Sequence, residues 1–320
     1  MPVGPGRRVP LDGADVLAAS IGGTWDGASY AGSIQRFPAR ALAAVTYRQL
    51  EPLSPSDQLH LQRLRQTLAG CHRVCVAYSG GVDSSLVAAI AHEQLAGEAQ
   101  AVTGVSPALA PHLLREARQQ AVWLGIRHRE VVTRELDDPD YRSNPQDRCY
   151  ACKRELHRHL GPIAAAADGA LVLDGVNEDD LRDHRPGIVA ARQAGVRSPL
   201  AELQIDKAAV RRLSKALGFP WWDKPAQPCL ASRFPYGEAI SSERLARVGQ
   251  AEAWLIERGF PQVRVRSQGL AARIEVPEGQ IGALLKGSTR RALVSALLAL
   301  GFTSVSVDLE GLVSGKLNRV

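Results

Sequence analysis

A glycine-rich turn, Ser79-Gly80-Gly81-Val-Asp83-Ser84-Ser85, lies between a short apolar run and an Ala/Leu-rich run. Its two glycines would let the backbone approach a phosphate closely, and free N–H groups at the start of a following helix would attract the anion. The serines add hydroxyl donors, and Asp83 suits such a turn if it holds a divalent cation that accompanies the phosphates. The spacing predicts a phosphate-binding turn; the alternative is a generic glycine-rich connection between a strand and a helix.

The cysteines form the second group that could do chemistry. Cys149 and Cys152 form a C-x-x-C pair, which is typical of a zinc half-site, a redox pair or iron–sulfur ligands, and there is no second pair to complete a four-cysteine zinc site. Together with Cys229 they could hold a 4Fe–4S cluster in which one iron lacks a protein ligand and could bind an extra sulfide. Alternatively, Cys229 acts alone as a nucleophile or sulfur donor. Cys71 and Cys75 are expected to be small buried hydrophobes.

Strands and helices alternate around the glycine-rich turn. Apolar runs predict strands at 73–78, 101–105, 128–133 and 170–174, and periodic segments predict helices at 56–68, 84–95, 111–124 and 207–217. Such alternation is typical of an α/β fold with a doubly wound parallel sheet. His157 and His159 are expected on a helix, facing solvent.

The chain divides into three parts by composition. Residues 1–54 are rich in Gly, Ala and Pro and predict a flexible or loosely packed extension. Residues 55–218 contain the strands and helices of the nucleotide-binding domain. A proline-punctuated stretch begins at 219 and is followed by helices at 241–258 and 287–300 and strands at 262–266, 272–276 and 303–309, so 219–320 predicts a smaller α+β domain that serves substrate binding or oligomerisation.

Composition excludes some classes of protein. In 320 residues, 45% are hydrophobic, which is enough for a sizeable core and excludes wholesale disorder. The net charge of +6 suits a phosphate-bearing ligand, but it is dispersed along the chain and does not indicate nucleic acid. No apolar run approaches the roughly 20 residues of a membrane span. An odd count of five cysteines without an export signal favours a cytoplasmic protein without disulfides.

The turn Ser79–Ser84 resembles the signature of the PP-loop ATP pyrophosphatases, and it lacks the GK[ST] ending of a Walker P-loop. The resemblance implies an adenine nucleotide alpha hydrolase-like fold that uses ATP and Mg²⁺. It also implies cleavage between the α- and β-phosphates, loss of pyrophosphate and adenylylation of a substrate oxygen. The ATP-binding residues would be Ser79, Gly80, Gly81, Asp83, Ser84 and Ser85.

Further segments resemble the LarE family, ATP-dependent sulfurtransferases that make the nickel-pincer nucleotide cofactor. They are residues 147–153, 173–187, 198–200, 222–237, 264–266 and 272–276, and the likeness covers roughly residues 56–277. It implies a small-molecule nucleotide substrate, pyridinium-3,5-biscarboxylic acid mononucleotide, one carboxylate of which is adenylylated and then converted to a thiocarboxylate. The family precedent is also a higher homo-oligomer.

The family has two sulfur routes. In one, the cysteine at the position of Cys229 loses its own sulfur and becomes dehydroalanine. In the other, three cysteines hold a 4Fe–4S cluster that carries a labile sulfide. Because Cys149, Cys152 and Cys229 all match, the three-cysteine branch is expected, with Cys229 and Asp83 as catalytic residues. The source of the sulfide stays open.

A substrate with one phosphate and two carboxylates calls for several basic partners. Arg264 and Arg266 match the family's RVR strand, and alternation places both on one face. The other expected substrate-binding residues are Arg185, Ser232, Arg233, Glu252 and Glu275. The alternative for any one of them is a solvated surface residue.

Three other functions fit the phosphate-binding turn. A tRNA-thiolating PP-loop enzyme would need a concentrated basic patch or an RNA-binding module. A PP-loop amidotransferase partner would not need the three cysteines. A catalytically inactive nucleotide-binding regulator would not need Asp83.

Overall fold

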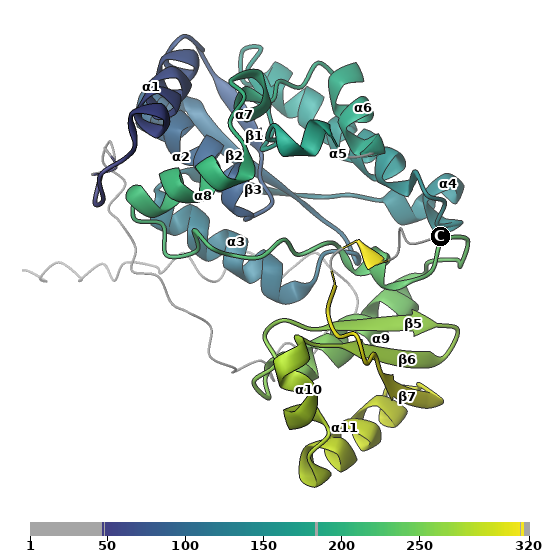
Figure 1. The fold of residues 1–320 in the computed structure, drawn as a ribbon. Helices are drawn as coiled ribbons and strands as arrows, with labels where there is room; N and C mark the ends of the chain where they lie inside the picture. Colours follow the sequence, from purple (N-terminus) through teal and green to yellow (C-terminus); the bar gives the residue numbers. More distant parts are fainter. Residues whose placement is uncertain (1–46, 48, 183–184, 314, 317–320) are drawn as a thin grey trace, which may run out of the picture.

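The computed structural model describes residues 47, 49–182, 185–313 and 315–316 (Figure 1). Most of the predicted extension, residues 1–46 and 48, lies outside the described residues. The described end of that extension is not loosely packed. Tyr47 is buried, donates a hydrogen bond to the Leu124 carbonyl (2.8 Å) and stacks on Trp123, and the Leu50 amide donates to the Ala216 carbonyl (2.7 Å). The packed part of the chain therefore begins before residue 55.

A four-stranded parallel sheet forms the centre of the first domain. Its strands are β1 (Val74–Ala77), β2 (Ala99–Val105), β3 (Arg127–Val132) and β4 (Leu171–Leu173), in the order β3-β2-β1-β4. The strand order reverses between β1 and β4. In an open α/β sheet, ligands bind outside the carboxyl ends of the strands at this reversal. The glycine-rich turn directly follows β1 and so lies at this place.

Helices cover both faces of the sheet (Figure 1). The core on one face joins the sheet to α1 (Pro55–Ala69), α2 (Val82–Leu95), α3 (Pro111–Leu124) and α8 (Lys207–Ala216). On the other face Cys75 and Ala77 of β1 pack with Leu160 and Ile163 of α5 (Arg148–Ala166). The predicted doubly wound α/β fold is confirmed. Cys71 and Cys75 are buried as expected.

The second domain is built on a small mixed sheet. Strand β5 (Arg264–Gln268) pairs antiparallel with β6 (Ala271–Glu275), which pairs parallel with β7 (Ser304–Val307). Helices α9 (Ser242–Ile256), α10 (Glu278–Leu284) and α11 (Gly287–Ala299) pack with this sheet (Figure 1). The predicted smaller α+β region is therefore present.

Shorter helices complete the described chain. They are η1 (Ala96–Glu98), η2 (Glu135–Asp137), α4 (Pro139–Arg142), η3 (Asp179–Leu181), α6 (Pro186–Gln193), α7 (Pro199–Glu202) and η4 (Leu230–Arg233). Within the described ranges, no helix combines the length and the hydropathy that crossing a bilayer requires.

The proline-rich segment after residue 218 belongs to both domains. Phe219 and Trp221 pack in the core of the first domain, past the boundary placed from the sequence. Further along, the Leu230 amide donates to the Ala108 carbonyl and the Ile240 amide to the Arg142 carbonyl, each at 2.8 Å. One apolar cluster contains residues from both domains. The segment is therefore a structural link between the two domains.

Candidate functional site

The turn after β1 is held in a tight, pre-formed shape. Gly80 has a positive φ of 68°, and a Cβ there would lie 2.9 Å from the Ala117 Cβ, so no other residue fits without a shift. The Ser79 hydroxyl accepts a hydrogen bond from the Gly81 amide (3.3 Å) and lies 3.1 Å from the Ser84 hydroxyl. The turn runs directly into the N-terminus of α2, where the helix dipole favours an anion.

One carboxylate, Asp83, belongs to this turn, and a second, Asp180, lies near it. Asp83 accepts a hydrogen bond from the Asn177 side-chain amide (3.1 Å) and is paired with the Lys207 ammonium group. Burial raises the pKa of Asp180, and the charge of Asp83 adds to that shift. Arg185 forms an ion pair with Asp180 (2.7 Å). The end of β4 thus brings polar side chains from residues 177–185 next to the turn.

Ser85 is placed differently from its neighbours in the turn. Its side chain is fully buried, and its hydroxyl lies 3.4 Å from the Tyr78 hydroxyl, behind the turn. Burial raises the pKa of Tyr78. The Ser85 hydroxyl faces the core, and this placement disfavours a contact between its side chain and ATP. That contact stays a prediction.

Lys224 is a residue of this site that sequence reasoning missed. It comes from the proline-rich segment, yet its ammonium group donates to the carbonyl of Gly80 (3.1 Å) and pairs with Glu116 of α3 (2.7 Å). Its side chain is only 12% exposed. The sequence feature that could have indicated it is a single lysine between two prolines, in the segment 222–237 that resembles the LarE family. The contact places a positive charge on the phosphate-binding turn.

The three predicted cysteines come from two segments of the chain. Cys149 and Cys152 lie on the first turns of α5, and Cys229 is the residue before η4. Desolvation raises the pKa of both Cys149 and Cys152, and the charge of Cys229 raises both further. Across the described part of the chain, however, no three His, Cys, Asp or Glu side chains are gathered closely enough to form a metal site.

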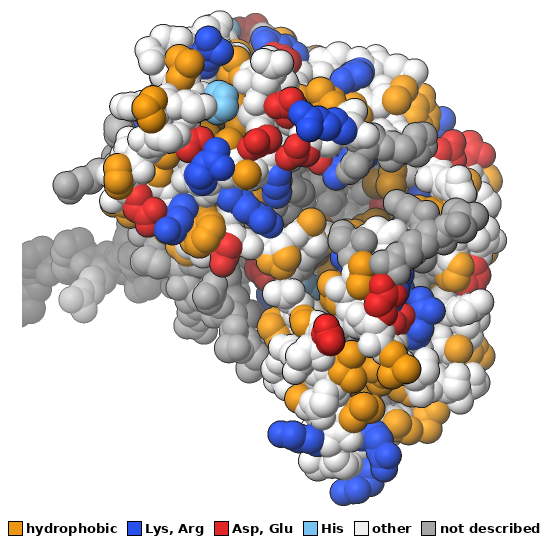
Figure 2. Space-filling model, viewed as in Figure 1, with side chains coloured by type: hydrophobic (Ala, Val, Ile, Leu, Met, Phe, Trp, Pro, Cys, Tyr) orange, Lys and Arg blue, Asp and Glu red, His pale blue; other side chains and the backbone are white. Residues whose placement is uncertain are grey.

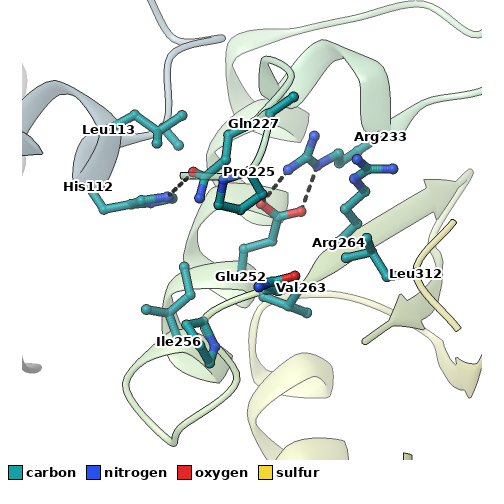
Figure 3. Close-up of a pocket in the computed structure, with 14 residues that line it drawn as sticks. His112, Leu113, Pro225, Gln227, Arg233, Glu252, Ile256, Val263, Arg264 and Leu312 are labelled. Atoms are coloured by element: carbon teal, nitrogen blue, oxygen red, sulfur yellow. Dashed lines mark hydrogen bonds and ion pairs between the residues drawn. The ribbon is translucent and has the colours of Figure 1, made fainter. Parts of the chain in front are cut away.

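A pocket between the two domains is lined by residues of α3, of the proline-rich segment and of the second domain (Figure 3). Arg233 and Glu252 form a buried bidentate ion pair (2.7 and 3.0 Å), and His112 of α3 lies 3.3 Å from the Gln227 side-chain oxygen. Arg264 lines the same pocket, and its one hydrogen bond among the described residues goes to the Val313 carbonyl (3.2 Å). Burial and the nearby guanidinium groups of Arg266 and Arg233 lower the pKa of Arg264. Arg264 has no carboxylate partner among the described residues, so its charge suits an anionic ligand in the pocket.

Several predicted substrate residues hold residues 228–233 in place. We call this stretch, which contains Cys229, the cysteine turn. Arg266 forms a buried bidentate ion pair with Glu275 (both distances 3.0 Å) and donates to the Ser232 carbonyl (2.6 Å). The Ser232 hydroxyl donates to the Cys229 carbonyl (2.8 Å), and Arg233 donates to the Pro228 carbonyl (3.0 Å). The solvated-surface alternative is wrong for five predicted substrate residues that are buried: Arg233, Glu252, Arg264, Arg266 and Glu275. Arg185 is exposed.

Arg185 connects the two sites electrostatically. It is half-exposed and pairs with Asp180 beside the phosphate-binding turn. Burial raises the pKa of Cys149, and the charge of Arg185 offsets part of that rise. The expectation for the two histidines of α5 is wrong for one of them. His157 is buried, which lowers its pKa to about 4, whereas the partly exposed His159 pairs with Glu155 (3.0 Å).

The sheet order and the turn at its reversal define a PP-loop α/β protein of the ATP-utilising type. The family model for asparagine synthase matches residues 62–146, which span the turn and the first three strands.

Comparison with curated proteins is more specific. The chain is 38% identical over 252 residues to pyridinium-3,5-bisthiocarboxylic acid mononucleotide synthase of Lactiplantibacillus plantarum, covering 78% of this chain and 91% of that protein. It is 55% identical to the uncharacterized protein slr1717 of Synechocystis sp., covering 81% of this chain and 97% of that protein. It is 26% identical to the uncharacterized protein MJ0830 of Methanocaldococcus jannaschii, covering 74% and 90%. The chain belongs to the LarE family, the family of the Lactiplantibacillus synthase.

Proposed function

We propose that this protein is an ATP-dependent sulfurtransferase of nickel-pincer nucleotide cofactor biosynthesis. It adenylylates a carboxylate of pyridinium-3,5-biscarboxylic acid mononucleotide and converts that carboxylate to a thiocarboxylate. The observation that carries the proposal is the proline-rich segment, which contacts the phosphate-binding turn through Lys224 and presents Cys229 five residues later beside an arginine-lined pocket. The Lactiplantibacillus relative is named for the synthesis of a pyridinium bisthiocarboxylic acid mononucleotide, which supports this product.

In the first step ATP lies on the turn Ser79–Ser84. A substrate carboxylate oxygen attacks the α-phosphorus, the bond to the β-phosphate oxygen breaks, and pyrophosphate leaves. The backbone amides of the turn and the Lys224 ammonium group would stabilise the negative charge that develops on the phosphates. Asp83 would hold Mg²⁺ together with phosphate oxygens, exchanging its present partner Lys207 for the cation.

The pyridinium nucleotide would occupy the pocket between the two domains. Arg264 lacks a carboxylate partner among the described residues, so its guanidinium group is the best placed to bind the substrate phosphate or its second carboxylate. Arg233 and Arg266 would act through their glutamate partners, by holding the cysteine turn in a fixed position. Ser232 and Arg185 would be further contacts to the substrate.

In the second step sulfur attacks the activated carbonyl carbon, the carbon–oxygen bond to AMP breaks, and a thiocarboxylate results. Cys229 can donate its own sulfur: its thiolate forms a thioester, and loss of the Cα proton with cleavage of the Cβ–S bond leaves dehydroalanine. Alternatively, Cys149, Cys152 and Cys229 would hold a 4Fe–4S cluster. Thiolates are the ligands that such a cluster takes, and the cluster would supply an iron site for an exchangeable sulfide. In the described part of the chain the three thiols are not gathered as a metal site, so this route would require them to move closer together.

Cysteine variants test these routes. Under the cluster route, alanine at Cys149, Cys152 or Cys229 should lower iron content and sulfur transfer together, while pyrophosphate release continues. Under the sacrificial route, only the change at Cys229 should stop sulfur transfer, and turnover should leave a polypeptide lighter by the mass of one H₂S. Cys71→Ala is the matched control, because Cys71 is buried elsewhere and should affect neither readout. Absence of pyrophosphate release from the wild-type protein with ATP and substrate would refute the proposed function.

The other functions have less support. On the face drawn in Figure 2, basic side chains alternate with acidic ones over the first domain, and a tRNA-thiolating enzyme would favour a concentrated basic patch. An inactive regulator would not need Cys229 beside the pocket. The cytoplasmic location and the homo-oligomeric state stay predictions.

A further inference from the structure

Residues 224–230 of the proline-rich segment lie along the first half of α3 and the loop before it. We call them the docked segment. Three contacts join the docked segment to this part of the first domain: the ion pair Lys224–Glu116 (2.7 Å), the hydrogen bond between Gln227 Oε1 and His112 Nε2 (3.3 Å), and the hydrogen bond from the Leu230 amide to the Ala108 carbonyl (2.8 Å). Figure 3 shows the contact between His112 and Gln227.

The three contacts follow a regular order. Along the docked segment they come three residues apart, and on the side of α3 they come four residues apart in the opposite direction. Because residues four apart share one face of a helix, Glu116 and His112 present the same face of α3 to the docked segment. The docked segment therefore runs antiparallel to α3, from the phosphate-binding turn toward the cysteine turn (Figure 1).

Helix α3 also supports the phosphate-binding turn itself. A Cβ at Gly80 would lie 2.9 Å from the Ala117 Cβ, so the turn and α3 are in close contact. Lys224 reaches both of them, because its ammonium group donates to the Gly80 carbonyl (3.1 Å) and pairs with Glu116. One helix thus holds the turn on which ATP would lie and the segment that leads to Cys229.

Two prolines make the docked segment stiff. Pro225 and Pro228 have no N–H group, so the segment cannot continue as a regular helix and depends on the contacts that its other residues make. Proline also fixes its own φ at about −65°. A position imposed at Lys224 and Gln227 is therefore transmitted to Cys229, which follows directly after Pro228.

We propose that Glu116 and His112 are positioning residues that set where Cys229 lies relative to the activated carboxylate. The inference rests on the proposed function and deepens it. Sulfur delivered at Cys229 competes with water for the acyl-adenylate. Attack by sulfur breaks the carbon–oxygen bond to AMP and gives the thiocarboxylate, whereas attack by water breaks the same bond, regenerates the carboxylate and releases a proton. Correct placement of Cys229 favours sulfur over water.

The test measures thiocarboxylate formed and pyrophosphate released in one anaerobic reaction, with ATP in excess and the protein in excess of the substrate. Misfolded protein contributes to neither product, so their ratio reports on positioning rather than on stability. Glu116→Gln and His112→Leu each remove one contact of the docked segment. Each should lower the ratio of thiocarboxylate to pyrophosphate about three- to tenfold, while pyrophosphate release itself falls much less.

Each variant has a matched partner. Glu130 of β3 is as exposed as Glu116 (31% against 32%) and pairs with Arg118 of α3 (2.6 Å) rather than with the docked segment. Glu130→Gln should therefore leave the ratio at the wild-type value. His112→Gln keeps a hydrogen-bond donor for Gln227 and should retain most of the ratio that His112→Leu loses.

Two results would overturn the inference and leave the proposed function standing. An unchanged ratio in both Glu116→Gln and His112→Leu, with both products reduced together or not at all, would mean that these contacts only stabilise the fold. An equal fall in His112→Leu and His112→Gln would mean that the contact with Gln227 does not position Cys229. A wild-type protein that releases no pyrophosphate would refute the proposed function and the inference with it. If one of the variants fails to fold, the other decides alone.

Discussion

Gly175 offers the sharpest test of how the phosphate-binding turn is supported. It follows β4, and a Cβ built on it would lie 2.5 Å from the Ser84 nitrogen, 2.8 Å from the Ser84 Cα and 3.0 Å from the Asp83 carbonyl carbon. All three contacts are backbone atoms, which cannot rotate away. Because carbon makes favourable contacts at about 3.5–4.0 Å, Gly175→Ala must separate the end of β4 from the start of α2 by about 1 Å.

Two consequences of that displacement can be measured. Forcing a methyl group into a packed site costs about 1–3 kcal/mol, which in a chain of this size lowers Tm by about 2–10 °C. The Ser84 amide would also leave its position in the turn, and a displacement of about 1 Å can reduce a reaction rate about a hundredfold. We expect Gly175→Ala to lower pyrophosphate release by about one to two orders of magnitude. Differential scanning fluorimetry and a pyrophosphate assay measure the two effects separately.

Gly282→Ala is the matched control. Gly282 lies on α10, and a Cβ there would meet nothing within 4 Å. Alanine should therefore stabilise the helix by about 0.5–1 kcal/mol and leave pyrophosphate release unchanged. If Gly175→Ala matched the wild type in both Tm and pyrophosphate release, the close approach of β4 to α2 would not be what supports the turn.

Three further predictions separate binding from stability. Arg264→Met should weaken substrate binding, measured by calorimetry, about ten- to a hundredfold with little change in Tm. Arg266→Met should instead leave the buried Glu275 unpaired and lower the free energy of unfolding by about 3–5 kcal/mol. The reverse pattern would contradict the assignment. Lys224→Met should lower the affinity for ATP about tenfold. Lys215→Met removes an exposed ion pair and should leave that affinity unchanged. If both variants changed the affinity for ATP equally, Lys224 would not belong to the nucleotide site. Burial lowers the pKa of His157 to about 4, so between about pH 4 and 6.5 the unfolded chain binds a proton that the folded chain does not. The free energy of unfolding should therefore rise by up to about 1.4 kcal/mol per pH unit over this range. Urea titrations should show a flatter pH profile for His157→Leu.

The local features of the fold could be predicted from the sequence because they depend on neighbours along the chain. Alternating apolar runs and the glycine-rich turn identified the four strands and the helices α1, α2, α3 and α8 within a few residues, and the doubly wound sheet followed from their alternation. The bounds of α4 to α7 were not predicted. The start of α8 also depends on neighbours along the chain, because the Asp206 side chain accepts a hydrogen bond from the Ala209 amide and so caps the helix. Burial of Cys71 and Cys75 also followed from the apolar character of their surroundings.

The partners of charged side chains could not be predicted in the same way. Residue type alone made Arg233, Arg264 and Arg266 equivalent candidates for an anionic substrate. Two of them have glutamates that neutralise them, and these partners lie 19 and 9 residues away along the chain. Only the third faces the pocket without a carboxylate among the described residues.

The sequence by itself thus determined which chemistry the protein can perform: a phosphate-binding turn, three matching cysteines and an arginine-rich strand. The tertiary structure alone decided which of these groups meet. Lys224 reaches the carbonyl of Gly80, 144 residues earlier, because the proline-rich segment packs against both domains. Contacts of that range depend on how whole elements pack, and packing buries side chains according to shape and total apolar area rather than to any local pattern.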